Sequence, residues 1–245
     1  ADLVIPAIAD YYSIRVLARM NINLTAPGAF PAKPTFAAHV AVKQDIYTNE
    51  VHFIKTSIYS NGVDAVTNAN LVAYARQTDS MKVEGGAFNI LNSILTAYQY
   101  IQNNTSAVDT TCLSPKLNVY WKLGFNPFQY SDPAADPSYI ANGSYYNKSE
   151  ENLYITGGRL GDISIDVTNH FDDYVIIHEL GHHIENKCGQ LLSPGGTHAM
   201  LARIDPRLAW SEGWSNFLAA QVMYDANSIA KINPDIGPKL LASGS

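Results

Sequence analysis

The stretch 175–187, VIIHELGHHIENK, is the part of the sequence that best predicts the fold around a functional site. It contains two histidines four residues apart, His178 and His182. On a helix, this spacing puts both imidazoles on one face, about one turn apart, so both can reach a single metal ion. Glu179, beside the first histidine, can reach a water molecule on that metal rather than the metal itself. The apolar residues around the motif would bury the other side of the helix.

We predict that this helix runs from about residue 170 to 187. Asn169 is its predicted N-cap, and Asp172 and Asp173 would lie in its first turn, where the helix dipole favours negative charge. The competing interpretation is a chance match, because the five-residue motif also occurs in unrelated proteins. The motif therefore needs a third metal ligand from elsewhere in the chain before it predicts a site.

The position of the third ligand separates the known families of zinc peptidases. In the metzincin pattern, a glycine would fall at Glu185 and a third histidine at Cys188, and neither residue matches. Cys188 could bind a metal as a thiolate, but without the glycine the helix has no evident reason to turn back there. The metzincin pattern is therefore disfavoured.

A better third ligand is Glu212, in the sequence WSEGWSNF at 210–217 on a predicted last helix, 206–226. It follows His182 by 30 residues. This arrangement resembles the gluzincins, whose third ligand is a glutamate on the helix after the histidine motif. In thermolysin-like members, the position of Asn216 carries an acid that orients a metal-bound histidine, and the Asn216 carbonyl could accept an imidazole N–H. The competing interpretation for both residues is an ordinary polar position on a helix surface.

The resemblance implies a single catalytic Zn²⁺ ion held by the two histidines and Glu212, with Glu179 as the general base of amide hydrolysis. It also implies an edge strand that pairs with an extended substrate, which we place at 145–147. The candidates for oxyanion stabilisation are His198 and Tyr224. A surface position explains His198 as well, and helix packing explains Tyr224. We expect His183 to be structural and Trp210 and Trp214 to pack in the core.

The rest of the chain predicts an α+β protein. Alternating apolar residues predict strands at 14–24, 36–42 and 51–59, which form a β-rich N-terminal module over residues 1–82. Helical spacing then predicts an amphipathic helix over 87–102. The remainder, 83–245, is the expected zincin-like domain, a mixed sheet with the active-site helix and the third-ligand helix. Because the chain ends 33 residues after Glu212, we expect a C-terminal lobe to be absent.

The composition narrows the choice of partners and compartment. The net charge is −6, from 16 Lys and Arg against 22 Asp and Glu, and no block of like charge suggests binding to nucleic acid or an anionic membrane. No apolar run approaches the roughly 18 residues of a membrane span. Few charged residues and many Tyr, Asn, Ser and Thr favour a secreted, periplasmic or cell-surface protein. A disulfide between Cys112 and Cys188 fits an oxidising compartment, and two buried free thiols are the alternative.

The sequence therefore predicts a zinc peptidase that acts on peptides or proteins, most simply as an endopeptidase. An aminopeptidase or another amidohydrolase on the same site is one alternative, although no motif for binding a substrate amine is evident. A surface-binding protein with a structural zinc ion is the other. Glu179 favours catalysis over the structural role, because a structural site needs no general base.

Overall fold

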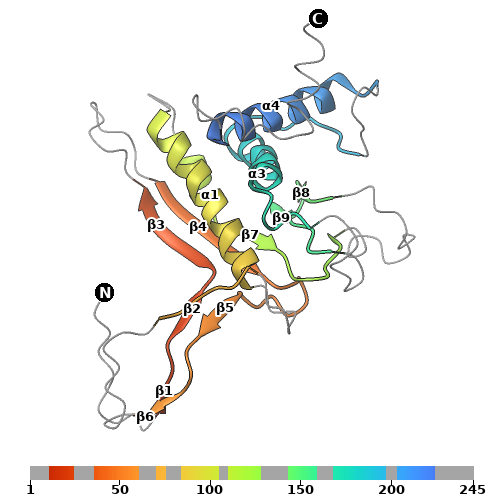
Figure 1. Cartoon of the computed structure of the whole chain (residues 1–245). Coiled ribbons are helices and arrows are strands. Elements are labelled where there is room, and N and C mark those ends of the chain that lie inside the picture. The colour runs from red at the N-terminus through yellow and green to blue at the C-terminus, as the bar shows by residue number, and fades with distance from the viewer. Residues whose placement is uncertain are drawn as a thin grey trace, which may run out of the picture.

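A computed structural model describes most of the chain, with mixed α and β structure. The described residues are 11–24, 36–60, 70–75, 84–104, 110–127, 143–158, 168–196 and 203–223. Within these ranges the helices are α1 (Glu84–Asn104), the short 3₁₀ helix η1 (Thr111–Leu113), α3 (Asp173–Cys188) and α4 (Pro206–Met223). Figure 1 shows α4 lying across α3, with α1 beside the strands β3 and β4.

The largest sheet has five strands in the order β3-β4-β7-β9-β8. Their bounds are β3 (Arg19–Leu24), β4 (Phe36–Lys43), β7 (Leu117–Tyr120), β9 (Asn152–Tyr154) and β8 (Tyr145–Asn147). The three inner strands run parallel, whereas β3 and β8 run antiparallel to their neighbours. Two short ribbons, visible in Figure 1, pair β1 (Tyr11–Tyr12) with β6 (Tyr59–Ser60) and β2 (Arg15–Leu17) with β5 (Phe53–Lys55).

One face of the sheet forms the main hydrophobic core with the helices. The strand register aligns Val40 with Leu117 and Val119 with Leu153, so these side chains lie on the same face. All four are buried in one cluster together with residues of α1 and α3. From the helices, this cluster takes Ala87, Ile90, Ile94, Ala97 and Tyr98 of α1 and Tyr174, Ile176, Ile177, Leu180 and Ile184 of α3. The core thus fixes the helix of the histidine motif against the sheet.

The opposite face of the sheet carries a row of tyrosines. The rings of Tyr120 and Tyr154 stack with centroids 5.3 Å apart, and those of Tyr154 and Tyr145 with centroids 5.0 Å apart. Side chains alternate along a strand, so Tyr146 on β8 lies on the helix-covered face. There its ring makes a T-shaped contact with the His183 ring, and its hydroxyl accepts a hydrogen bond from Asn186 of α3. The register of β8 therefore ties the edge strand to α3.

The structure changes several details of the expected elements. The strands β3 and β4, from the predicted N-terminal module, share a sheet and a core with β7. The strand predicted over 14–24 is interrupted at Ala18. Its alternation also overstates burial, because Val16 is 42% exposed and Ile22 is 40% exposed.

The start of the helix that carries the histidine motif also differs from the prediction. The N-cap of α3 is Asp172 rather than Asn169, because the Asp172 carboxylate accepts the backbone N–H of Val175 at 3.1 Å. Among the described residues, no helix is long and apolar enough to cross a membrane.

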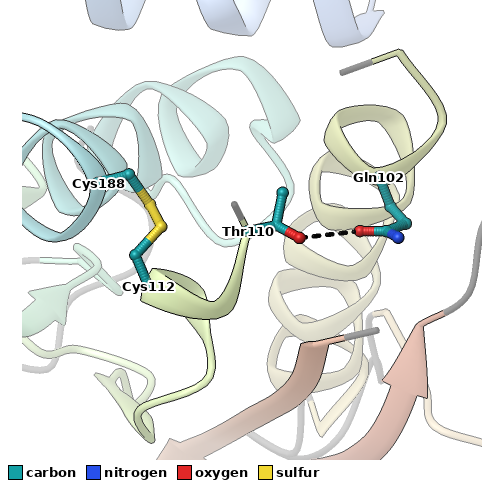
Figure 2. Close-up of a disulfide and its surroundings, with 4 residues drawn as sticks. All are labelled: Gln102, Thr110, Cys112 and Cys188. Atoms are coloured by element: carbon teal, nitrogen blue, oxygen red, sulfur yellow. Dashed lines mark hydrogen bonds between the residues drawn. A yellow bond between two sulfur atoms is a disulfide. The ribbon is translucent and has the colours of Figure 1, made fainter. Parts of the chain in front are cut away.

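A disulfide joins Cys112 of η1 to Cys188 at the end of α3, which decides between the two alternatives that the sequence left open. Figure 2 shows this bond beside the hydrogen bond in which the Thr110 hydroxyl donates to Gln102 of α1 at 3.2 Å. The two contacts anchor the segment that contains η1 to the ends of two helices. They hold the C-terminal end of the histidine-motif helix in place.

We expect the disulfide to contribute strongly to stability, because it closes a long loop. Its cysteines are 76 residues apart, and the chain-entropy model gives a loss of about 4.5 kcal/mol in unfolding free energy when such a bond is removed. Urea unfolding of the Cys112→Ser/Cys188→Ser double variant, against the oxidised wild type, measures this loss. A decrease below about 1 kcal/mol would contradict the expectation.

Candidate metal centre and its cleft

Helices α3 and α4 approach each other closely at the histidine motif. A Cβ atom added to Gly181 would lie 2.8 Å from the Cα of Ser215, so a larger residue there would push the helices apart. Trp214 secures the same contact, because its indole N–H donates to the Gly181 carbonyl at 3.2 Å. The glycine inside the motif thus permits the approach that brings Glu212 toward the histidines.

Three side chains from the two helices converge on one point. Nε2 of His178 lies 3.1 Å from one carboxylate oxygen of Glu212, and Nε2 of His182 lies 3.5 Å from the other. The potential ligand atoms of the three residues all lie within 4.8 Å of one another. Each side chain keeps 13–14% of its surface exposed, so the group is reached from solvent. These residues could therefore hold a metal ion.

The spacing suits a small tetrahedral ion. Zinc binds imidazole nitrogen and carboxylate oxygen at about 2.0–2.2 Å, which in a tetrahedron separates neighbouring ligand atoms by about 3.3 Å. The two measured nitrogen–oxygen distances lie on either side of this value. Two imidazoles and one carboxylate also form a donor set that zinc accepts readily. The residues present thus fit the ion that the sequence predicted.

The other ring nitrogen of His178 is held by Asn216 on α4. The distance from His178 Nδ1 to Asn216 Oδ1 is 3.0 Å, and the hydroxyl of Tyr174 donates to the same oxygen at 2.9 Å. An amide oxygen accepts, so Nδ1 carries a proton, and Nε2 is the nitrogen that would bind the metal ion. This is the contact expected of Asn216 from the sequence. Burial alone would lower the pKa of His178, but Glu212 and Glu179 outweigh it and raise that pKa.

The general-base candidate, Glu179, is 7% exposed and lies in the wall of the cleft beside the three converging residues. Burial raises its pKa to about 7, and the negative charge of Glu212 acts in the same direction. The positive charge of His178 and a hydrogen bond from the backbone N–H of Tyr146 act against this rise. A carboxyl group with such a pKa can both accept and return a proton near neutral pH.

The three converging residues line a cleft with a volume of about 490 Å³. One wall is β8 with its flanking residues, 143–148. The other wall contains Leu208 of α4 and residues of the segment 191–196. The strand predicted at 145–147 is thus an edge strand of the sheet, and it borders the candidate metal centre.

The remaining predicted residues have mixed outcomes. His183 is buried against Tyr146 and away from the cleft, as expected of a structural residue. Trp214 packs against the core, but the prediction for Trp210 is wrong, because that residue is 70% exposed. The two oxyanion candidates, His198 and Tyr224, lie outside the described residues.

Sequence reasoning missed two serines that contact the second histidine. Nδ1 of His182 lies 2.9 Å from the hydroxyl oxygen of Ser211 and 3.0 Å from that of Ser215. Both serines lie on α4, four residues apart and therefore on one face of that helix. The available signal was that Ser211 directly precedes Glu212 and that Ser215 follows one helical turn later. This signal does not reveal which histidine the serines face.

No protein-family model, curated protein or solved structure matches the chain.

Proposed function

We propose that the protein is a zinc-dependent endopeptidase of the gluzincin type. The observation that carries this proposal is the convergence of His178, His182 and Glu212 in an open cleft, with Glu179 beside them. A structural zinc ion is normally enclosed by four protein ligands, whereas a catalytic ion keeps one position for water or substrate. Three ligands that border a cleft favour the catalytic role.

Zinc bound at this site would polarise a peptide carbonyl and lower the pKa of a water molecule. The three ligand side chains would hold and orient the ion. Glu179 would accept the proton of the attacking water and pass it to the amine that leaves. Its raised pKa supports this double use, since a strongly acidic carboxyl group would return the proton poorly.

The edge strand β8 supports a peptide as the substrate. All three residues of β8 lie opposite partners on β9, and the backbone N–H of Tyr146 donates to Glu179. The N–H and C=O of one residue point to the same side of an antiparallel strand, so the carbonyl of Tyr146 also lies on the outer edge of β8, where it can accept a hydrogen bond from an extended chain. Binding through backbone groups needs no free terminus, and this favours an endopeptidase over an aminopeptidase.

The proposed location is outside the cell or in another oxidising compartment. The disulfide between Cys112 and Cys188 supports this location, because such bonds are rare in reducing compartments.

The first test combines metal analysis with a cleavage assay. We expect about one zinc ion per chain, and cleavage of an unfolded protein substrate that stops when a chelator removes the zinc and returns when zinc is restored. Fragment sizes should show internal cuts rather than stepwise removal of terminal residues. Stoichiometric zinc without any cleavage would instead favour a non-catalytic binding protein.

A further inference from the structure

A chain of hydrogen bonds runs from Glu185 through Ser211 to His182. The Ser211 hydroxyl donates to the Glu185 carboxylate at 2.7 Å, and its oxygen lies 2.9 Å from Nδ1 of His182. The chain crosses from α3 to α4 and back, because Glu185 follows His182 by three residues on α3. Ser211 is 1% exposed, so water does not compete for these bonds.

The direction of each bond follows from the chemistry of the groups. An ionised carboxylate only accepts hydrogen bonds, so the single proton of the Ser211 hydroxyl must point to Glu185. The oxygen of Ser211 then offers a lone pair to His182. That lone pair requires a proton on Nδ1 of His182, so Nε2 is the nitrogen left to bind a metal ion.

Ser215 provides an internal comparison. Its hydroxyl oxygen lies 3.0 Å from the same nitrogen of His182, almost as close as that of Ser211. Within the described part of the chain, however, no carboxylate holds the Ser215 proton. The Ser215 hydroxyl can therefore rotate and either accept from Nδ1 or donate to it, and it does not fix the position of the histidine proton.

We infer that Glu185 and Ser211 are positioning residues that fix His182 as a metal ligand through Nε2. The inference rests on the metal site of the proposed function and adds two residues to it. Asn216 holds the first histidine directly through its amide oxygen, whereas the second histidine is held through a serine and a carboxylate. Orienting partners of this kind also raise the basicity of the ligand nitrogen.

The test measures zinc affinity by competition with a chromophoric chelator. Ser211→Ala should weaken zinc binding by about 10-fold to 100-fold, the usual effect of losing a partner that orients a histidine ligand. Ser215→Ala is the matched control and should change the affinity less. Glu185→Ala should also weaken binding, whereas Glu185→Gln should keep much of the affinity, because its carbonyl oxygen can still accept the Ser211 proton. The Ser211→Ala/Glu185→Ala double variant should bind zinc as tightly as Ser211→Ala alone, since the two residues act in one chain.

A second measurement follows the histidine proton without metal. Nitrogen NMR of the zinc-free Glu212→Ala variant, which lacks the carboxylate beside Nε2, should show the proton of neutral His182 on Nδ1, and adding Ser211→Ala should shift it at least partly to Nε2. Urea unfolding of each zinc-free variant checks that it is folded, and if Ser211→Ala fails to fold, the two Glu185 variants decide.

Wild-type affinity and an unchanged proton position in Ser211→Ala would overturn the inference. Fully additive losses of zinc affinity in the double variant would also overturn the inference. So would a larger loss of zinc affinity in Ser215→Ala than in Ser211→Ala. Neither measurement requires catalysis. A wild type that binds zinc and shows the expected coupling but cleaves no substrate would contradict only the peptidase proposal. A wild type that binds no zinc would contradict the proposed function, and the proton position would still decide the role of Ser211.

Discussion

Replacing Glu179 with Gln is expected to lower kcat/KM for cleavage of a peptide substrate by a factor of about 10²–10⁴, the usual contribution of a general acid–base group. Glutamine has nearly the same size and can still accept the backbone N–H of Tyr146, but it cannot take up a proton. The change therefore removes the proposed proton transfer while the cleft keeps its shape. A quenched fluorescent peptide that contains an internal cleavage site provides the measurement.

The zinc content of Glu179→Gln should equal that of the wild type, because Glu179 is outside the group that could hold the metal. Glu50→Gln is the matched control. Glu50 is an exposed acid outside the cleft lining, and the same neutralisation there should leave kcat/KM unchanged. If Glu179→Gln cleaved the peptide at the wild-type rate with zinc bound, Glu179 would not be the general base.

Replacing Glu212 with Ala is expected to weaken zinc binding by more than about 100-fold, the upper range for losing an orienting partner outside the metal ligands. The carboxylate of Glu212 lies 3.1 and 3.5 Å from the two histidine nitrogens, so its loss would leave two ligands for the ion. The rate of peptide cleavage at a fixed low zinc concentration should fall together with the zinc affinity. Competition with a chromophoric chelator measures the affinity directly.

Gln221→Ala is a control on the same helix, because residue 221 is exposed and lies outside the cleft lining. This variant should bind zinc as the wild type does. A Glu212→Ala variant with full zinc affinity would remove Glu212 from the ligand set. The thiolate of Cys188 would not replace it, because that residue is in a disulfide.

The local elements follow from sequence patterns. The spacing of apolar residues predicts α1 and α3 within a few residues, because one face of each must be buried against a sheet. The edge strand at Tyr145–Asn147 also forms where it was expected. The errors concern the ends of elements and the depth of burial. Asp172 is the cap instead of Asn169, because the side-chain oxygen of Asn169 accepts a hydrogen bond from the Ser144 hydroxyl, a tertiary contact that the sequence does not reveal.

The sequence by itself determined which residues could hold a metal ion and their order along the chain. Helix geometry alone places His178 and His182 on one face, because residues four apart lie about one turn from each other in any α-helix. The partners of a disulfide could also be inferred from the sequence, since no other cysteine is present to pair with these two. Each of these inferences depends on local geometry or on counting.

Only the tertiary structure decided how the second helix meets the first. Gly181 allows α4 to approach α3, and that approach places Glu212 against the histidines and Ser211 against His182. The contact between Ser211 and Glu185 joins residues 26 apart in the chain. Such a contact depends on the rotation of one packed helix against another, which a pattern within either helix does not contain. The histidine motif is therefore predictable from the sequence, whereas the residues that orient its second histidine are not.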